Sequence, residues 1–260
     1  MRNATGITGV ELAGAQSHPT QTDPAARLLR RVLYVFSENP ISVVALLGFL
    51  LLLATAVFGR WFAPYDPLAT NAALALSPPS SAHWFGTDQL GRDVFSRVLV
   101  AARLDLFIAL SAVTLSFAAG ATIGGVAGFY GGWIDRASGR LIDTIMAFPL
   151  FVLAMGIVAA LGNTIENIIY ATAIINVPFY ARVARAEVNV RRNAGFVQAA
   201  RLSGNGDARI LVTQVFPNSL PPMMVQVSLN MGWAILNAAG LSFIGLGVRP
   251  PTPEWGIMVA

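Results

Sequence analysis

Long apolar segments constrain the fold of this chain more than any other feature of its sequence. They lie near 41–59, 106–129, 143–162, 167–184 and 223–246. A helix of roughly 20 mainly apolar residues crosses the hydrocarbon core of a bilayer and satisfies its own backbone polar groups there. Charged residues make up only 12% of the chain, against about a quarter in soluble domains. We therefore expect an all-α fold, a polytopic transmembrane helical bundle with five visible spans.

The first apolar segment has a second interpretation as a cleavable secretory signal. Ala54-Thr55-Ala56 resembles the small-residue site at which such signals are cut. The long region before this segment and the length of the apolar run favour an uncleaved span instead. Upstream, residues 1–26 lack apolar periodicity and predict a flexible tail. Residues 27–40 alternate arginine with apolar residues, which predicts an amphipathic helix at the membrane surface.

The distribution of arginine predicts the orientation of the spans. The chain has 17 basic residues, and all are arginine. The N-terminal side, the 131–140 loop and the 182–221 loop carry four, two and six of them. Basic residues concentrate on the cytoplasmic side of membrane proteins. We therefore place the N-terminus and the 182–221 loop in the cytoplasm, and the 60–103 loop outside.

The residues that are missing exclude several chemistries. Without lysine the chain has neither the phosphate-binding lysine of a P-loop nor an amine for Schiff-base catalysis. Without cysteine it has no disulfide, no thiol nucleophile and no cysteine metal site. His18 and His83 lie far apart in the sequence, which argues against a histidine metal cluster. We expect no catalytic residue, no cofactor and no metal.

Few ionisable residues fall in or near the spans. Asp105 and Asp143 stand where we expect helices to start, and a carboxylate there is favoured by the helix dipole. Glu166 belongs to a short predicted external turn. A proton-coupled carrier needs such groups near the middle of the membrane, and the sequence places none there.

Glycine and proline mark positions inside the spans. Gly120, Gly124 and Gly128 recur at every fourth residue, a spacing that lets membrane helices approach closely. Helix packing is the favoured interpretation, and a substrate path along the glycine face is the alternative. Pro149 and Pro178 are expected to bend the third and fourth spans. Such bends serve either as hinges or as tolerated irregularities, and the second interpretation is favoured.

An arginine-containing polar segment separates the last two spans. Phe196 to Ser203 has the length of a short helix, and Gly204 supplies a left-handed stop. Asp207 stands where an N-cap would start a second helix over 208–215, which Pro217 would close. A helix, a tight turn and a helix between spans are suited to docking on a soluble partner. The alternative is an ordinary solvated connection.

This segment resembles the "EAA" coupling loop of membrane subunits of bacterial ABC importers. Gln198-Ala199-Ala200, then Gly204, then Pro217 follow the spacing of that motif, with Gln198 in place of the family's glutamate. The resemblance implies a cytoplasmic coupling loop over 187–221 that contacts an ATPase. Its candidate ATPase-coupling residues are Phe196, Val197, Gln198, Ala199, Ala200, Arg201, Leu202, Ser203, Gly204, Asp207 and Pro217.

The 60–103 loop contains a second motif. Its residues Gly86, Thr87, Asp88, Gly91, Arg92 and Asp93 closely resemble the "GTDxxGRD" segment of the dipeptide, oligopeptide and nickel branch of ABC permeases. A calcium loop is the competing interpretation, but its D-x-[DN]-x-[DN]-G pattern is not met. We expect a turn-rich external element in which Arg92 and Arg97 pair with Asp88 or Asp93. Further matches to the branch lie at 131–136, 241–247 and 250–256.

The resemblance covers about residues 28 to 260 and implies a permease domain over 41–260. Such permeases usually have a sixth span, so the sequence ending at Ala260 is either truncated or lacks that helix. The implied location is the bacterial inner membrane. The implied partners are the lipid bilayer, a second homologous permease, two cytoplasmic ATP-binding subunits and an external solute-binding protein, with no nucleic acid.

Under this interpretation the chain performs no chemistry and forms a pathway for a short peptide or a related solute such as nickel or glutathione. No polar cluster in the spans identifies the cargo. A secondary transporter driven by an ion gradient is one alternative, favoured by inverted repeats around a midplane site, which the sequence does not display. A non-transporting membrane scaffold is the other.

Overall fold

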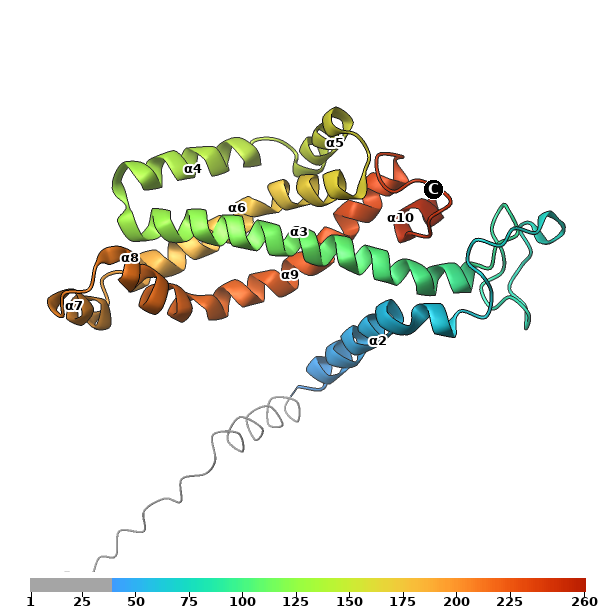
Figure 1. The fold of residues 1–260 in the computed structure, drawn as a ribbon, viewed down its shortest axis with the longest axis horizontal. Helices are drawn as coiled ribbons and strands as arrows, with labels where there is room; N and C mark the ends of the chain where they lie inside the picture. The colour runs from blue at the N-terminus through green and yellow to red at the C-terminus, as the bar shows by residue number, and fades with distance from the viewer. Residues whose placement is uncertain (1–38) are drawn as a thin grey trace, which may run out of the picture. The chain divides into compact units, whose positions relative to one another are not determined.

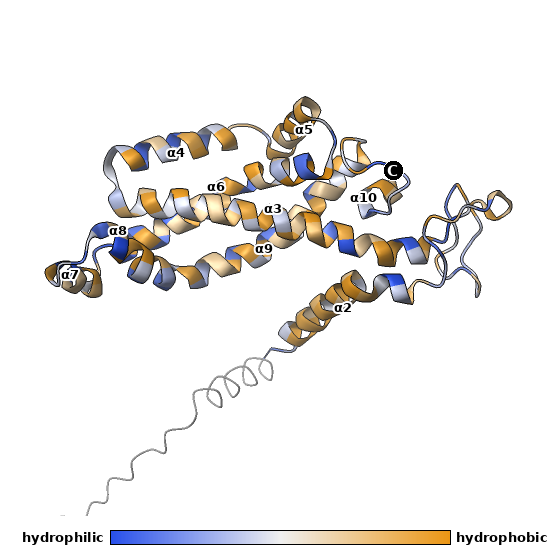
Figure 2. Ribbon diagram, in the orientation of Figure 1, coloured by the Kyte–Doolittle hydropathy of each residue, from blue (hydrophilic) through white to orange (hydrophobic). Residues whose placement is uncertain are grey.

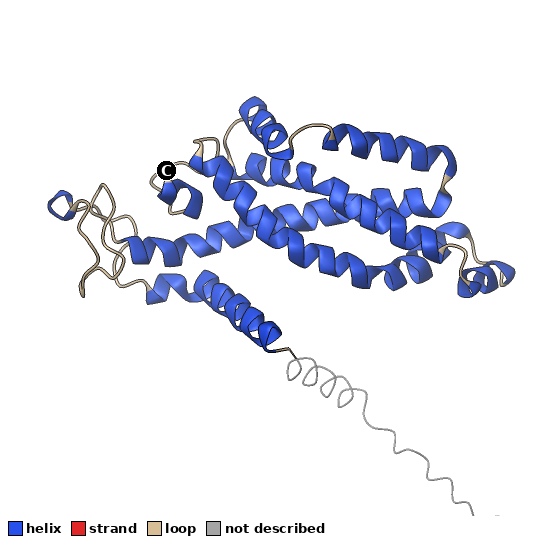
Figure 3. Ribbon diagram, turned by 180° about the vertical axis from the view of Figure 1, so that it is seen from behind, coloured by secondary structure: helices blue, strands red, loops and turns tan. Residues whose placement is uncertain are grey.

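The computed structural model describes residues 39–260, and within this range the chain forms helices and turns with no strand (Figures 1 and 3). The predicted tail at 1–26 and nearly all of the predicted interfacial helix at 27–40 lie outside the described residues. Residues up to Leu51 and residues from Leu52 onward form two separate units, and the boundary falls within α2 (Pro40–Phe62). Each unit is described by itself.

Helix α2 is hydrophobic along almost its whole length (Figure 2). Pro40 begins it, at a position where a missing N–H costs no helical hydrogen bond. Most of its large apolar side chains are exposed, and Gly59 is its one buried residue among those described. A Cβ at Gly59 would lie 2.4 Å from the carbonyl oxygen of Leu99. The end of α2 therefore packs closely on the next long helix.

Three long helices, α3 (Val94–Tyr130), α6 (Ile165–Arg191) and α9 (Phe216–Phe243), pack against one another in the second unit (Figure 1). Buried apolar side chains between them include Ile108, Tyr180 and Leu241. These helices cover most of the second, fourth and fifth predicted spans. The all-α prediction is confirmed for residues 39–260.

The glycine stripe of α3 packs on α6. A Cβ at Gly124 would lie 2.1 Å from the carbonyl oxygen of Ala181, and Gly120 and Gly128 face the α6 backbone in the same way. Only hydrogen in place of a side chain allows this approach. The packing interpretation of the stripe is therefore confirmed.

The predicted bend of the third span, 143–162, at Pro149 is confirmed, and it is sharp enough to divide the span into two helices. Helix α4 (Gly132–Met146) and helix α5 (Leu150–Leu161) meet at 86°. Pro149 is the N-cap of α5, and a proline disfavours helical backbone in the residue before it. Helix α5 alone has 12 residues, about 18 Å. By contrast, Pro178 lies inside an uninterrupted α6.

Length and composition select fewer spans than we expected. Among residues 39–260, α2 and α3 are long and apolar enough to cross a membrane, and the bent pair of α4 and α5 makes a third if it is one span. Helices α6 and α9 have 27 and 28 residues, but they carry more polar side chains and do not meet the same test.

The expected positions of three carboxylates are also wrong. Helix α3 starts at Val94, so Asp105 lies inside it, 2% exposed. Asp143 lies in the last turn of α4. Glu166 lies in the first turn of α6, after the N-cap Thr164. These helices extend beyond their apolar segments, which is why the apolar boundaries misplaced the carboxylates.

Candidate functional site

Helix α7 (Gly195–Leu202) connects α6 to the last long helix and lies at one end of the bundle, while α10 (Trp255–Val259) lies at the other (Figure 1). Gly204 follows it with a φ of +79°. The backbone N–H groups of Gly204 and Asn205 donate to the carbonyls of Arg201 and Ala200 at 2.9 and 3.1 Å. The predicted helix that stops at a left-handed glycine is thus confirmed, to within a residue at each end.

The two faces of α7 have different surroundings. Val197 is fully buried and Ala200 is 7% exposed, in an apolar cluster with Phe129, Val188 and Ile210. On the outer face, Leu202 is 90% exposed, and the other exposed candidates are Phe196, Gln198, Ala199, Arg201, Ser203, Gly204, Asp207 and Pro217. The sequence candidates therefore divide into residues that seat α7 and residues that it presents.

Two polar side chains hold α7 in place. Gln198, which stands for the family's glutamate, donates from Nε2 to the carbonyl of Asn193 at 3.1 Å. Arg201 donates from Nε to Asp207 at 3.1 Å, and its guanidinium lies over the ring of Phe129. Arg201 thereby links α7 both to the following helix and to the end of α3.

The second helix of this segment differs from the prediction. It starts at Asp207 in α8 (Asp207–Ile210), Gly206 is the N-cap, and no side chain caps it. The predicted N-cap role of Asp207 is therefore wrong. Pro217 does not close the helix either, because α8 continues through one π-helical turn, η2 (Leu211–Val215), into α9. A change of hydrogen-bond register next to a proline accommodates its missing donor.

The Gly86–Asp93 motif folds around Asp88. Its carboxylate accepts the backbone N–H groups of Leu90 and Arg92 at 2.9 and 3.0 Å and the Arg92 Nε–H at 2.7 Å. Arg97 Nε lies 3.7 Å from the same carboxylate. The predicted pairing of both arginines with an acidic residue of the motif is confirmed. Burial raises the pKa of Asp88, but the hydrogen bonds from Arg92 and Leu90 outweigh it, so this pKa lies below its ordinary value.

Asp93 caps α3 and is paired with a histidine, which we did not expect. Its Oδ2 accepts the N–H and the hydroxyl of Ser96 at 2.8 and 2.7 Å, and its Oδ1 lies 2.9 Å from His83 Nδ1. Burial raises the pKa of Asp93, and the bonds from Ser96 and His83 lower it further than burial raises it.

The remaining motif residues shape the turns. Gly86 and Gly91 have φ of +73° and +71°, and a Cβ at Gly91 would lie 1.8 Å from the Asn71 carbonyl oxygen. Thr87 accepts the N–H of Ser77 and donates to the Leu74 carbonyl, beside the short helix η1 (Ala72–Leu74). Among the described residues, no group of three acidic or histidine side chains is placed to hold a metal ion. These hydrogen bonds and glycine turns hold the motif together as a turn-rich segment before α3, the predicted external element.

Comparison with known proteins identifies the family. Residues 120–260 match the family described as "Binding-protein-dependent transport system inner membrane component". The chain belongs to this family. Residues 27–79 also match the "N-terminal TM domain of oligopeptide transport permease C". The transport component is thus recognised over most of its length.

Several relatives of this chain are named as transport system permease proteins. The chain is 41% identical over 223 residues to a dipeptide transport system permease protein of Alkalihalophilus pseudofirmus, covering 86% of this chain and 73% of the relative. It is 40% identical over 230 residues to a probable D,D-dipeptide transport system permease protein of Escherichia coli K12, covering 88% and 77%. It is 42% identical over 225 residues to a glutathione transport system permease protein of Escherichia coli O1:K1, covering 86% and 74%.

The transport component has a polar clamp near α10 that sequence reasoning missed. Arg97, 4% exposed, donates to the carbonyls of Pro67 and Pro251 at 3.0 and 3.4 Å. The backbone N–H of Trp255 donates to Asp105 at 3.2 Å, and its indole N–H donates to the Val98 carbonyl at 3.1 Å. The clamp joins the external element, α3 and α10. Its one sequence signal was an aspartate beside an apolar run, which we interpreted as a helix start.

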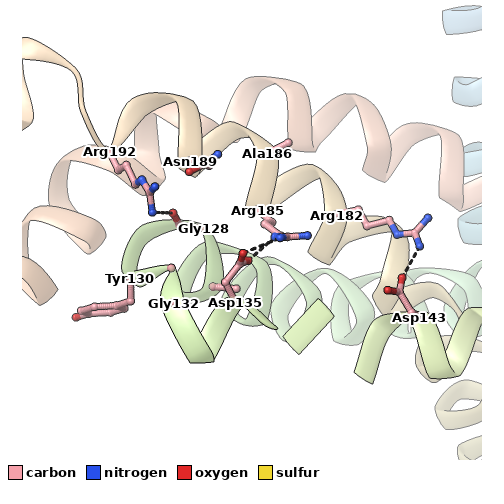
Figure 4. Close-up of a pocket in the computed structure, with 12 residues that line it drawn as sticks. Gly128, Tyr130, Gly132, Asp135, Asp143, Arg182, Arg185, Ala186, Asn189 and Arg192 are labelled. Atoms are coloured by element: carbon pink, nitrogen blue, oxygen red, sulfur yellow. Dashed lines mark hydrogen bonds and ion pairs between the residues drawn. The ribbon is translucent and has the colours of Figure 1, made fainter. Parts of the chain in front are cut away.

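A second missed feature of this transport component is a charged groove between α4 and α6 (Figure 4). It encloses about 780 Å³. Arg182 donates to Asp143 at 2.9 Å, and Arg185 forms a bidentate pair with Asp135. Arg192 donates to the Gly128 carbonyl at 3.3 Å. Residues of the groove are distant in sequence, so only the packed helices bring them together.

Proposed function

We propose that this chain is the membrane-embedded permease subunit of an ATP-driven importer and lines a translocation pathway for short peptides or a related small solute. Membership of the family of inner membrane transport components carries this proposal. The relatives' names, which refer to dipeptides, D,D-dipeptides and glutathione, support the solute class. The chain itself transports without enzymatic chemistry.

The exposed face of α7 is the proposed contact with a cytoplasmic ATPase subunit. Phe196, Gln198 and Leu202 project from a short helix between two long ones, and Val197 and Ala200 on its other face are buried in the apolar cluster. Force applied to α7 therefore passes into the bundle through Val197 and Ala200. ATP binding and hydrolysis take place in the partner subunits, and their closure switches the facing of the pathway as a rigid-body transition.

The external element is proposed to face the solute-binding protein. It is built from charged and turn-forming residues and contains the motif Gly86 to Asp93. It lies at the end of the bundle opposite α7 (Figure 1), as a protein that spans the membrane requires. The N-terminus is then cytoplasmic, and a second homologous permease completes the pathway.

Reconstitution tests this function. The chain is coexpressed with its neighbouring permease and ATPase subunits, purified, and placed in liposomes with ATP inside the compartment that α7 faces. We expect uptake of labelled dipeptide that depends on the binding protein and on ATP. Dipeptide uptake without ATP, driven by an ion gradient, would reject the proposal.

A pair of substitutions tests the role of α7 in the same complex. Leu202→Ser changes a side chain that is 90% exposed, so we expect normal membrane abundance and reduced ATPase binding. Ala208→Ser, also exposed and outside α7, is the matched control and should leave binding intact. Unchanged ATPase binding in Leu202→Ser and in Phe196→Ser would remove α7 from the interface.

A further inference from the structure

Helix α4 is attached to the rest of the bundle differently from its neighbours. Ile142 is its one buried residue among those described, whereas Trp133 and Leu141 are 72% and 54% exposed. An apolar core therefore does little to hold this helix. Acidic side chains of α4 instead face arginines of α6 across the groove of about 780 Å³ (Figure 4).

Both ends of α4 are sharp turns. Gly131 is its N-cap and Gly132 its first residue, with consecutive positive φ values of +67° and +59°, a conformation that glycine adopts with little strain. Beyond Met146 the chain turns by 86° into α5 at Pro149. Helix α4 therefore lies between two sharp turns, and residues at the ends of helices are where hinge motion is usually absorbed.

Two ion pairs span the groove. Arg182 and Asp143 lie 2.9 Å apart and are 52% and 70% exposed, and Arg185 holds both carboxylate oxygens of Asp135. Exposed ion pairs are individually weak, so two of them shift an open-to-closed ratio by about tenfold. Contacts of this strength hold a helix in one position yet yield to the binding of a partner.

The groove is connected to α7 through a single helix. Arg182 and Arg185 lie near the end of α6, and only Arg192, Asn193 and Ala194 separate that helix from α7. Val188 of α6 packs in the same apolar cluster as Val197 of α7. A displacement of α7 therefore moves the arginines relative to α4.

We propose that the two ion pairs form a reversible latch that holds α4 against α6 and opens or closes the groove as α7 is displaced. Only the partner that drives the latch, an ATPase at α7, rests on the proposed function. The turns at both ends of α4 and its charge pairing with α6 belong to the chain itself.

Distances between spin labels test the latch. The chain lacks cysteine, so Gly139→Cys on α4 and Val190→Cys on α6 place one label on each side. A side chain at Gly139 meets nothing within 4 Å, and Val190 is 76% exposed. Double electron–electron resonance then measures the distance between the two labels in the full complex, without nucleotide and with trapped ATP.

Without further substitutions, we expect a narrow distribution of label distances. Its mean should shift by several ångströms, more than 2 Å in any case, between the nucleotide-free and the ATP-trapped complex. Arg182→Gln combined with Arg185→Gln should broaden the distribution and make it the same in both states. Arg136→Gln, on α4 but in no ion pair among the described residues, is the matched control and should behave as unchanged. Asp143→Arg should broaden the distribution, and adding Arg182→Asp should narrow it again.

A distribution that the double arginine change leaves unaltered overturns the latch, and so does a separation that is equal in both states of a complex that takes up solute. A complex that takes up no solute in the unchanged background argues against the proposed function instead. In that case the broadening by the arginine changes, measured in the purified full chain, still decides whether the ion pairs hold α4.

Discussion

The guanidinium carbon of Arg201 lies 5.8 Å from the centroid of the Phe129 ring, so the helix proposed to meet the ATPase rests on the last turn of α3. Phe129 is 4% exposed and belongs to the apolar cluster that contains Val197 and Val188. One side chain thus connects α3, α6 and α7. The end of the bundle that carries α7 depends on it.

Phe129→Ala should destabilise this end of the protein. Loss of a buried phenylalanine costs about 3 to 5 kcal/mol through lost burial and the remaining cavity. We expect lower membrane abundance and a lower thermal unfolding midpoint. Tyr130→Ala is the matched control, because Tyr130 is adjacent but 46% exposed, and it should have a small effect. Equal stability of the two variants would contradict the seating role of Phe129.

Orientation in the membrane is tested with single cysteines at exposed positions of this cysteine-free chain. Ser80→Cys in the external element should react with an impermeant thiol reagent in intact cells, because the arginine distribution places it outside. Ser203→Cys next to α7 should react only after the cells are opened. Labelling of Ser203→Cys but not of Ser80→Cys in intact cells would show that the predicted topology is inverted.

Gly204→Val should abolish transport while the protein stays inserted. A side chain at this position meets nothing within 4 Å, so the cost arises from the φ of +79° alone. Left-handed backbone costs about 1 to 2 kcal/mol in most residues and more in β-branched ones. Gly204→Ala should be milder, and Gly204→Asn mildest because asparagine tolerates this conformation. Uptake and ATPase activity are measured with abundance checked by immunoblot, and full uptake by the valine variant would show that the turn is not needed.

Gly124→Ala should disrupt the contact between α3 and α6. Its Cβ would lie 2.1 Å from the Ala181 carbonyl oxygen, a distance that backbone must move to relieve. We expect a loss of about 1 to 3 kcal/mol, the usual cost of overpacking, seen as reduced yield and thermal stability. Gly139→Ala, where a Cβ meets nothing within 4 Å, is the control. Similar yields for both variants would show that the stripe is not tightly packed.

The external element should lose stability in acid. A carboxyl whose pKa is lower in the folded than in the unfolded chain binds fewer protons when folded, so it stabilises the fold above its ordinary pKa of 3.8. That contribution from Asp88 and Asp93 disappears as pH falls through the lowered values. We expect the contribution of Asp88 and Asp93 to the unfolding midpoint to be constant from about pH 8 to 5 and to decline below about pH 4, followed by tryptophan fluorescence.

Asp88→Asn provides the control for the acid effect. At neutral pH it should lower stability by about 1 to 3 kcal/mol, since charged hydrogen bonds to Arg92 and the backbone are lost. The difference from the unchanged protein should shrink as pH falls, because both then carry a neutral group. A difference that is independent of pH would show that the carboxylate charge is not what stabilises the turn.

Local chemistry was sufficient to predict the features that depend on neighbours in sequence. The apolar segments are occupied by helices, Gly204 ends α7, and Asp88 is paired with arginines a few residues away. Each follows from a rule that acts within a few residues, such as the missing Cβ of glycine. The motif around Gln198 likewise predicts where α7 lies in the sequence.

The apolar pattern predicted helix boundaries less well. It places Asp105 at a helix start, whereas α3 extends back to Val94, where Asp93 caps it. It also predicts one span across Pro149, where the chain turns sharply. Hydropathy reports the environment of a segment and not its backbone hydrogen bonding, so it detects neither a cap outside the membrane nor a break within an apolar run.

By itself, the sequence determined that this chain enters a membrane as helices and carries a short helix ending at a glycine. Only the tertiary structure decided which side of α7 is presented, because Val197 and Leu202 are both apolar and differ only in what packs against them. It also decided that Asp135 meets Arg185 across a groove, since 50 residues separate them in sequence. Packing between distant helices sets burial and charge pairing, and no local rule contains that information.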